Sequence, residues 1–318
     1  QAAIRLREAT ALTIPDAVYW IELDREGRAR LVCKPIDVSG TLSKSLFEAV
    51  ESVSLVSATL TTSGSFSFIR KELGVPEDAT EKAVESPFDF KSQAFIVIPE
   101  HGLPDPRAAQ FAGAVADRVG QVVELCNGRT LGLFTSYRVL NAVYDRIRAQ
   151  PFQIMKQGDL PRTELSRRFK SDVHSVLLGT DSFWTGIDVP GESLTGLVID
   201  KLPFPHPEDP VINAICERDP NAFFNVLVPR AIIAFRQGVG RLIRSRKDFG
   251  VVVVLDRRIL EKGYGKRFLN SLPSMYGSRR IDDIPKFLQK AAEAVAANED
   301  SSGAANDEHA PVVAPKVA

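Results

Sequence analysis

Three polar side chains late in the sequence have the types and spacing that phosphate chemistry needs. The stretch RQGVGRLIRS (236–245) carries Gln237, Arg241 and Arg244, four and then three residues apart. On a helix these residues share one face, and the glycines between them let another surface approach. Guanidinium groups placed in this way can stabilise the charge that develops on a phosphoryl group in transfer. The alternative is an Arg–Glu network on a solvated helix.

Three other stretches combine hydroxyl groups, glycines or charge with an apolar run: SATL (57–60), FTSY (134–137) and GTDSFWTGIDVPG (179–191). Ligands bind at the carboxyl ends of strands in an open α/β sheet, which makes all three candidate binding segments. A Ser or Thr in the first two is equally consistent with capping a helix. In the third, Trp184 is either a stacking face for a base or a core side chain.

A phosphate-binding loop is not visible in this sequence. The nearest match to GxxxxGK[ST] is GIDVPGES (186–193), which has Glu192 where a phosphate-binding Lys is needed. A carboxylate at that position would repel phosphate, and there is no acidic box of the DEAD or DEAH kind. We therefore expect this chain by itself to be inactive in ATP hydrolysis, because it lacks the Lys and the Mg²⁺ ligands.

Composition restricts the class of protein. Lys plus Arg and Asp plus Glu each number 40, so any nucleic-acid contact must come from a local basic surface. No apolar run approaches the roughly 18 residues that a membrane span needs, so we expect no membrane association. The scattered cysteines Cys33, Cys126 and Cys216 indicate neither a disulfide framework nor a metal site, which favours a reducing cytoplasm. The first residue is Gln, which predicts a piece of a longer protein.

The elements that must position these side chains alternate between strand and helix. Continuous apolar strands separated by helices are typical of a parallel sheet covered on both faces, so the predicted fold class is α/β. The predicted strands are 129–136, 151–158, 174–180, 194–204 and 249–256. The predicted helices are 137–150, 162–170, the long segment 225–243, and 284–297.

Residues 1–90 have a different pattern and indicate the end of another domain. Residues 17–23 and 29–36 predict a hairpin, and 42–50 and 65–75 predict helices. Residues 52–60, SVSLVSATL, predict a buried strand that ends in polar groups. We therefore expect a first domain over 1–90 and a second over 91–297. The Ala-, Pro- and acid-rich residues 298–318 predict a disordered tail.

The four motifs, in this order and spacing, resemble those of superfamily two DNA helicases of the XPD-like, DinG type. SATL resembles motif III, LFTSY motif IV, GTDSFWTGIDVPG motif V and QGVGRLIRS motif VI. The stretches SPFDF, GDLPRTELSRRFK, DKLPFPHPEDPV and VPRAIIAFRQ are also similar to that group. The resemblance covers roughly residues 1–275. It implies RecA-like motor domains, with the end of the first and the whole of the second in this chain.

The resemblance also implies roles for matching residues. Arg241 and Arg244 would contact the ATP phosphates as arginine fingers, with Gln237 coupling nucleotide to the cleft between motor domains. Gly186 and Asp188 would lie near the nucleotide. Two residues would link hydrolysis to domain movement: Ser57 and Thr59. Six residues would face single-stranded DNA: Thr135, Ser136, Tyr137, Thr180, Ser182 and Trp184. One departure is Thr185, since relatives often have Glu there.

The activity implied is that of an ATP-dependent DNA helicase of the bacterial cytoplasm, acting as a monomer on single-stranded and forked or partly duplex DNA. Its cofactors would be ATP and Mg²⁺, with most ligands upstream of these residues. An iron–sulfur cluster would belong to the longer protein and not to these residues. Two alternatives stay open: a non-catalytic nucleic-acid-binding module derived from a motor half, and an unrelated α/β phosphate-binding protein.

Overall fold

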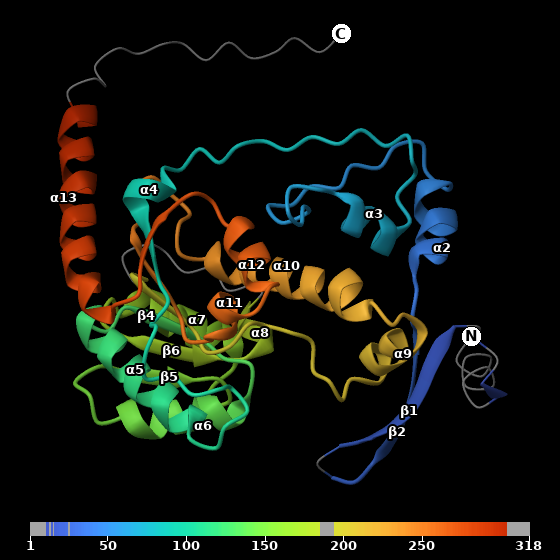
Figure 1. Cartoon of the computed structure of the whole chain (residues 1–318), viewed down its shortest axis with the longest axis horizontal. Coiled ribbons are helices and arrows are strands. Elements are labelled where there is room, and N and C mark those ends of the chain that lie inside the picture. Colours follow the sequence, from blue (N-terminus) through green and yellow to red (C-terminus); the bar gives the residue numbers. More distant parts are fainter. Residues whose placement is uncertain (1–10, 13, 15, 25, 185–193, 304–318) are drawn as a thin grey trace. The chain divides into compact units, whose positions relative to one another are not determined.

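The computed structural model describes residues 11–12, 14, 16–24, 26–184 and 194–303. They form two compact units (Figure 1). The first unit draws on 1–85, 202–238 and 258–272, and the second on 86–201, 239–257 and 273–318. The limits of these two units differ from the domain boundaries predicted at 90/91 and 297/298. Those boundaries stay a prediction.

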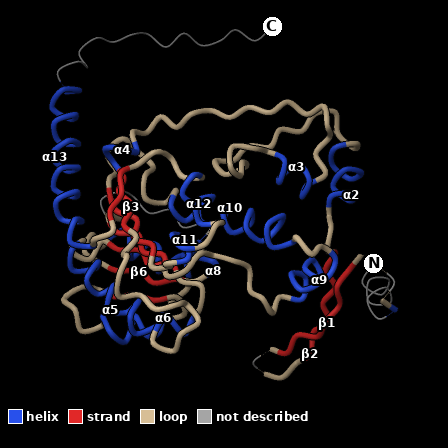
Figure 2. The backbone as a smooth tube through the Cα atoms, in the orientation of Figure 1, coloured by secondary structure: helices blue, strands red, loops and turns tan. Residues whose placement is uncertain are grey.

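The second unit is built on a parallel sheet, whose strands are drawn red in Figure 2. The strand order is β5-β6-β4-β7-β8-β3-β9. Its strands are β3 (Ala94–Val97), β4 (Thr130–Leu133), β5 (Ile154–Lys156), β6 (Val176–Gly179), β7 (Gly196–Ile199), β8 (Gly250–Val254) and β9 (Tyr276–Ser278). The four central strands β6, β4, β7 and β8 are buried throughout, which explains their uninterrupted apolar sequences. The predicted α/β class and parallel sheet are confirmed.

Helices flank this sheet on both faces. They are α4 (Phe90–Gln93), α5 (Phe111–Leu125), α6 (Tyr137–Ile147), α7 (Arg162–Ser171), α8 (Asp181–Trp184) and α13 (Ile284–Gly303), with the 3-10 turn η4 (Ile281–Asp283). The chain runs from β4 through α6 to β5 and back through α7 to β6, in opposite directions along the sheet. Right-handed crossovers therefore place α6 and α7 on opposite faces. α5 packs against α6, and Figure 1 shows the two together.

Two helix boundaries differ from the sequence-based expectation. α13 continues to Gly303, six residues beyond the helix end predicted at residue 297. Its Ile284, Leu288 and Ala291 are buried, and this apolar stripe anchors the helix against the core. The long helix predicted over 225–243 is instead η3 (Phe223–Leu227) followed by α10 (Val228–Val239), and the chain turns from Gly240 onward. Glycine has a low helix propensity, which favours an end at this point.

The first unit contains the predicted hairpin of β1 (Ala17–Leu23) and β2 (Ala29–Pro35), which pair antiparallel. Its helices are α2 (Ser39–Leu42), η1 (Ser43–Phe47), α3 (Ser67–Leu73), α9 (Pro210–Arg218), η3, α10, α11 (Arg258–Glu261) and α12 (Gly265–Asn270). An aromatic cluster links its late segments: the rings of Phe204 and Phe223 stack with centroids 5.6 Å apart. Tyr264 and Phe268 meet Phe204 edge-on.

The buried strand predicted over residues 52–60 is wrong. This segment is irregular, pairs with no strand of the described chain, and leaves Val56 92% exposed. A strand is stable only when a neighbour satisfies its backbone groups, and an apolar sequence cannot supply that neighbour. Among the described residues, no helix is both long and apolar enough to cross a bilayer.

Candidate nucleic-acid interface

A row of polar side chains crosses the carboxyl ends of four adjacent strands of the second unit. Gln157 follows β5, Thr180 follows β6, Thr135 follows β4, and Asp200 follows β7. Tyr137, the first residue of α6, belongs to the same group because its hydroxyl accepts a hydrogen bond from Gln157. We call these five residues the carboxyl-end row. Because parallel strands end at one edge of a sheet, residues far apart in sequence are brought together here.

Asp200 holds the turn that follows β4. Its Oδ1 accepts hydrogen bonds from the backbone N–H of Thr135 at 2.9 Å and of Lys201 at 2.7 Å. Its Oδ2 lies 3.3 Å from the Thr135 Oγ1. The carboxyl group is fully buried, and this desolvation raises the pKa of Asp200 to about 7, although Lys201 and the hydrogen bonds from Thr135 lower it in part.

Gln157 ties two neighbouring loops together. Its Oε1 accepts from the Thr180 backbone N–H at 2.6 Å and lies 3.1 Å from the Thr180 hydroxyl. Its Nε2 donates to the Tyr137 hydroxyl at 2.7 Å. One amide side chain therefore connects the end of β6 to the first residue of α6.

The exposed part of the row is the start of α6. Ser136 is the residue before the helix, has extended backbone angles and makes no side-chain cap. Its buried Oγ has no hydrogen-bond partner among the described residues, while Thr135 is partly exposed. Tyr137 is 52% exposed. A helix start carries free N–H groups and positive partial charge, so these three residues can approach a phosphate group.

Two predicted DNA-facing residues are buried instead. Trp184 is 4% exposed, and its indole N–H donates to the Phe134 carbonyl at 3.2 Å. The stacking role is therefore corrected, and the core alternative describes this structure. Thr180 is also buried and engaged with Gln157. Gly179 makes room for this arrangement, since a Cβ there would lie 2.3 Å from the Phe183 ring of α8.

Arg241 and Arg244 do not share one helical face, because α10 ends before them. Arg241 is buried, and its Nε and Nη2 donate to the Trp184 carbonyl at 3.0 and 2.7 Å. Arg244 lies in a turn that Asp248 organises by accepting from the backbone N–H of Arg244 and of Ser245. The two arginines therefore have different surroundings.

The turn that contains Arg244 is also held by Gln93, which directly precedes β3. Gln93, the last residue of α4, donates through its Nε2 to the carbonyl of Ser245 at 2.8 Å and to that of Asp248 at 2.7 Å. These bonds span more than 150 residues of sequence. The backbone at Arg244 is thus fixed by side chains from two elements of the second unit.

In the first unit, α10 contacts the SATL stretch. Arg236 donates to the carbonyls of Thr61 and Ala58, at 2.5 and 3.3 Å. Gln237 donates to the Thr59 hydroxyl at 3.3 Å, and Thr59 Oγ1 lies 3.4 Å from the Ser57 hydroxyl. Two residues that sequence reasoning assigned separately, Gln237 and Thr59, are therefore hydrogen-bonded partners. Arg236 was not among the predicted site residues.

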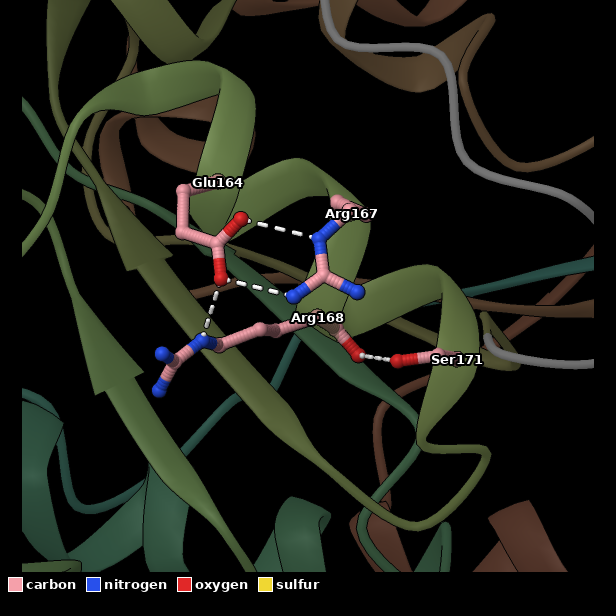
Figure 3. Close-up of polar contacts among 4 residues, drawn as sticks. All are labelled: Glu164, Arg167, Arg168 and Ser171. Carbon is pink, nitrogen blue, oxygen red and sulfur yellow. Dashed lines mark hydrogen bonds and ion pairs between the residues drawn. The ribbon is translucent and has the colours of Figure 1, made fainter.

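The arginines of α7 are engaged locally (Figure 3). Glu164 accepts from Arg167 Nη2 at 2.7 Å and from Arg168 Nε at 2.8 Å, one turn along the helix. These hydrogen bonds lower the pKa of Glu164 to about 2. Because both arginines are exposed and Glu164 is partly exposed, this is a surface network that contributes little to stability.

Some predicted site residues cannot be placed. Gly186 and Asp188, with the departure at Thr185, lie outside the described residues. Ser182 belongs to α8, but its side chain is also outside the description. Sequence reasoning missed Asp200 and Gln157. Asp200 could have been found from its position directly after the apolar run LTGLVI. Gln157 could have been found as a polar residue at the end of a short predicted strand.

The geometry defines a class of protein before any family is considered. The seven-stranded parallel sheet flanked by helices has a RecA-like fold, which solved helicases share. An XPD helicase structure matches 87% of this chain and 50% of its own, with a TM-score of 0.61 and 20% identity. The S. tokodaii Xpd4 structure matches 79% of this chain and 49% of its own, with a TM-score of 0.53 and 16% identity.

Residues 119–275 match the helicase C-terminal domain family. The ATP-dependent DNA helicase YoaA of Haemophilus influenzae is 34% identical over 90% of this chain and 45% of the relative. The ATP-dependent helicase DinG of Mycobacterium tuberculosis is 33% identical over 92% and 46%. The 3'-5' exonuclease DinG of Bacillus subtilis is 35% identical over 84% and 30%. The predicted DinG-type resemblance is confirmed, and the chain spans less than half the length of these relatives.

Proposed function

We propose that this chain is the carboxyl-terminal part of an ATP-dependent DNA helicase that couples ATP hydrolysis to movement on single-stranded DNA and to duplex unwinding. In this proposal residues 1–90 end the first motor domain and 91–297 form the second. The observation that carries it is the carboxyl-end row. At the start of α6, the Thr135 N–H donates a hydrogen bond to Asp200, and Gln157 donates one to the Tyr137 hydroxyl. This helix start lies in the part of the chain that matches a helicase family.

The DNA-contacting surface would consist of Thr135, Ser136 and Tyr137. The helix start offers N–H groups to phosphates, the hydroxyl groups of Thr135 and Tyr137 can donate to them, and the exposed tyrosine ring can stack on a base. Thr180 and Trp184 are buried and would support this surface from below. The substrate would be single-stranded DNA, as part of forked or partly duplex DNA, bound by a monomer in the bacterial cytoplasm.

The ATP-contacting residue of this chain would be Arg244, with Gly186 and Asp188 near the nucleotide as the resemblance implies. The turn fits a phosphate-bearing group because Asp248 and Gln93 fix its backbone while the Arg244 side chain is partly exposed. Arg241 fits less well, since its guanidinium donates to the Trp184 carbonyl. ATP would supply the free energy of movement, and Ser57, Thr59 and Gln237 would link its hydrolysis to motion.

For the metal, the described residues contain no group of three or more His, Cys, Asp or Glu side chains able to hold an ion. The three cysteines are free thiols, and none pairs with another. Mg²⁺ and any iron–sulfur cluster would thus depend on residues other than those described.

Binding of labelled oligo(dT) to this chain, followed by fluorescence anisotropy at several salt concentrations, tests the proposal. Affinity should fall as salt rises, because phosphate contacts release counterions. Tyr137→Ala should weaken binding by roughly 1–3 kcal/mol if the ring stacks on a base. Tyr276→Ala, which removes a ring that is 65% exposed on β9 of the same unit, is the matched control and should bind normally. Equal affinities for both variants would contradict the proposed surface.

A further inference from the structure

In one of the hydrogen bonds that Asp200 makes, donor and acceptor can exchange roles. Oδ1 can only accept, because both of its partners are backbone N–H groups, those of Thr135 and Lys201. Oδ2 faces a hydroxyl, Thr135 Oγ1, at 3.3 Å. A hydroxyl group both donates and accepts, so the direction of this contact depends on whether Oδ2 carries a proton.

The direction decides what Thr135 offers to a ligand. When the carboxyl group is ionised, the Thr135 hydroxyl donates its only hydrogen to Oδ2 and presents lone pairs outward. When Oδ2 is protonated, it donates to Thr135 Oγ1, and the threonine hydrogen is free to point elsewhere. Phosphate oxygens accept hydrogen bonds and do not donate them, so only the second arrangement suits a phosphate.

We propose that Asp200 is a positioning residue that acts through Thr135, and that the proton on its Oδ2 determines whether the Thr135 hydroxyl donates to a phosphate of bound single-stranded DNA. This inference rests on the proposed function, in which Thr135 contacts DNA. The proton comes from solvent, and no covalent bond other than the carboxyl O–H forms or breaks.

The surroundings of Asp200 make this switch accessible near neutral pH. Burial raises the pKa of the carboxyl group to about 7, and Lys201, the charged residue next to it after β7, lowers it only in part. On one side, β4 contributes the uncharged Thr135. On the other side, β8 is followed by Asp256, a second buried carboxyl group. Thr135 is partly exposed, so its hydroxyl hydrogen can reach a ligand.

Two substitutions separate this role from a purely structural one. In Asp200→Asn the side-chain N–H₂ donates permanently to Thr135 Oγ1 while Oδ1 still accepts the two backbone N–H groups, which imitates the protonated acid. In Thr135→Val the hydroxyl is gone. Both substitutions should abolish the pH dependence of DNA affinity that comes from this pair. The affinity should stay high in Asp200→Asn and low in Thr135→Val at every pH.

The experiment measures labelled oligo(dT) binding to the whole chain about one pH unit below and above the pKa of about 7. The wild-type affinity should fall with rising pH, roughly three- to tenfold, as expected for loss of one hydrogen bond of ordinary strength. Above the pKa, Asp200→Asn should bind tighter than wild type. Circular dichroism melting at both pH values verifies that each variant is folded.

The outcomes are distinguishable. If wild type binds no oligo(dT) at either pH, the proposed function fails and this inference fails with it. If wild type binds but folded Asp200→Asn has the same affinity and the same pH profile, only the switch is overturned. If Asp200→Asn melts early and binds worse at both pH values, Asp200 is structural and the switch is also overturned.

Discussion

Two segments of this protein have nearly the same kind of sequence and entirely different structures. Residues 52–60, SVSLVSATL, and residues 129–136, RTLGLFTS, are both apolar runs that end in hydroxyl side chains. The second forms β4 at the centre of the sheet, with Leu131 and Leu133 fully buried. The first is irregular, and its Leu55 and Val56 are exposed.

The difference lies in what flanks each segment. β4 has β6 on one side and β7 on the other, so both rows of its backbone groups are paired. Residues 52–60 have no pairing strand among the described residues, and their hydroxyl end is held by side chains of α10. A pattern therefore indicates what a segment can become, while its neighbours decide what it becomes.

The largest difference between the two segments should be the loss in the free energy of unfolding when an apolar side chain is truncated. Leu133→Ala removes a fully buried side chain and should lower the free energy of unfolding by about 2–5 kcal/mol. Leu55→Ala removes one that is 40% exposed and should cost much less. Urea unfolding followed by circular dichroism measures both. A Leu55→Ala cost equal to that of Leu133→Ala would show that residues 52–60 are buried in solution.

The next effect is the pH dependence of stability at the end of β7. The pKa of Asp200 is about 7 in the folded chain against 3.8 for the free group, because burial disfavours the charge. Between these values the folded state holds a proton that the unfolded state has lost, so stability falls as the pH rises. The loss should total roughly 3 kcal/mol between about pH 4 and pH 7.

Asp200→Asn has no such proton, so the difference in melting temperature between wild type and this variant should narrow or reverse as the pH rises through this window. Thermal melts of both proteins at matched pH give the difference directly. A difference that stays constant with pH would mean that the Asp200 carboxyl group titrates near its ordinary pKa.

A smaller effect should come from the amide that links two strand ends. Gln157→Ala leaves the buried Thr180 backbone N–H without its acceptor, which should cost about 1–3 kcal/mol. Gln153→Ala, an exposed glutamine just before β5, is the matched control and should change stability little. Hydrogen exchange at Thr180 should accelerate in the first variant alone. Unchanged exchange would mean that water or another group replaces the amide.

The smallest effect should be at the irregular segment. Thr59→Val removes the acceptor of a 3.3 Å contact with Gln237 at a partly exposed site. We expect a change in unfolding free energy within about 0.5 kcal/mol. A cost as large as that of Gln157→Ala would show that the α10 contacts order residues 52–60 as firmly as the sheet orders β4.

The sequence by itself determined the central strands of the second unit and several of its helices, while β3, β9 and α5 were not predicted. Its uninterrupted apolar runs predicted the central strands β4, β6, β7 and β8, and the spacing of apolar residues predicted α6 and α7. The ordered motifs indicated the helicase relation that the family match confirms. These inferences succeed because strand burial and helix amphipathicity are written in local residue order.

Only the tertiary structure decided what individual side chains do. Helical spacing placed Arg241 and Arg244 on one face, but α10 ends at Val239 and leaves Arg241 hydrogen-bonded to the Trp184 carbonyl. Trp184 could be a stacking surface or core, and the packing around β4 buries it. Asp200 acquires its pKa from burial beside Thr135, which lies 65 residues away in sequence. Burial and long-range hydrogen bonds depend on which strand ends meet, and local residue order does not record that.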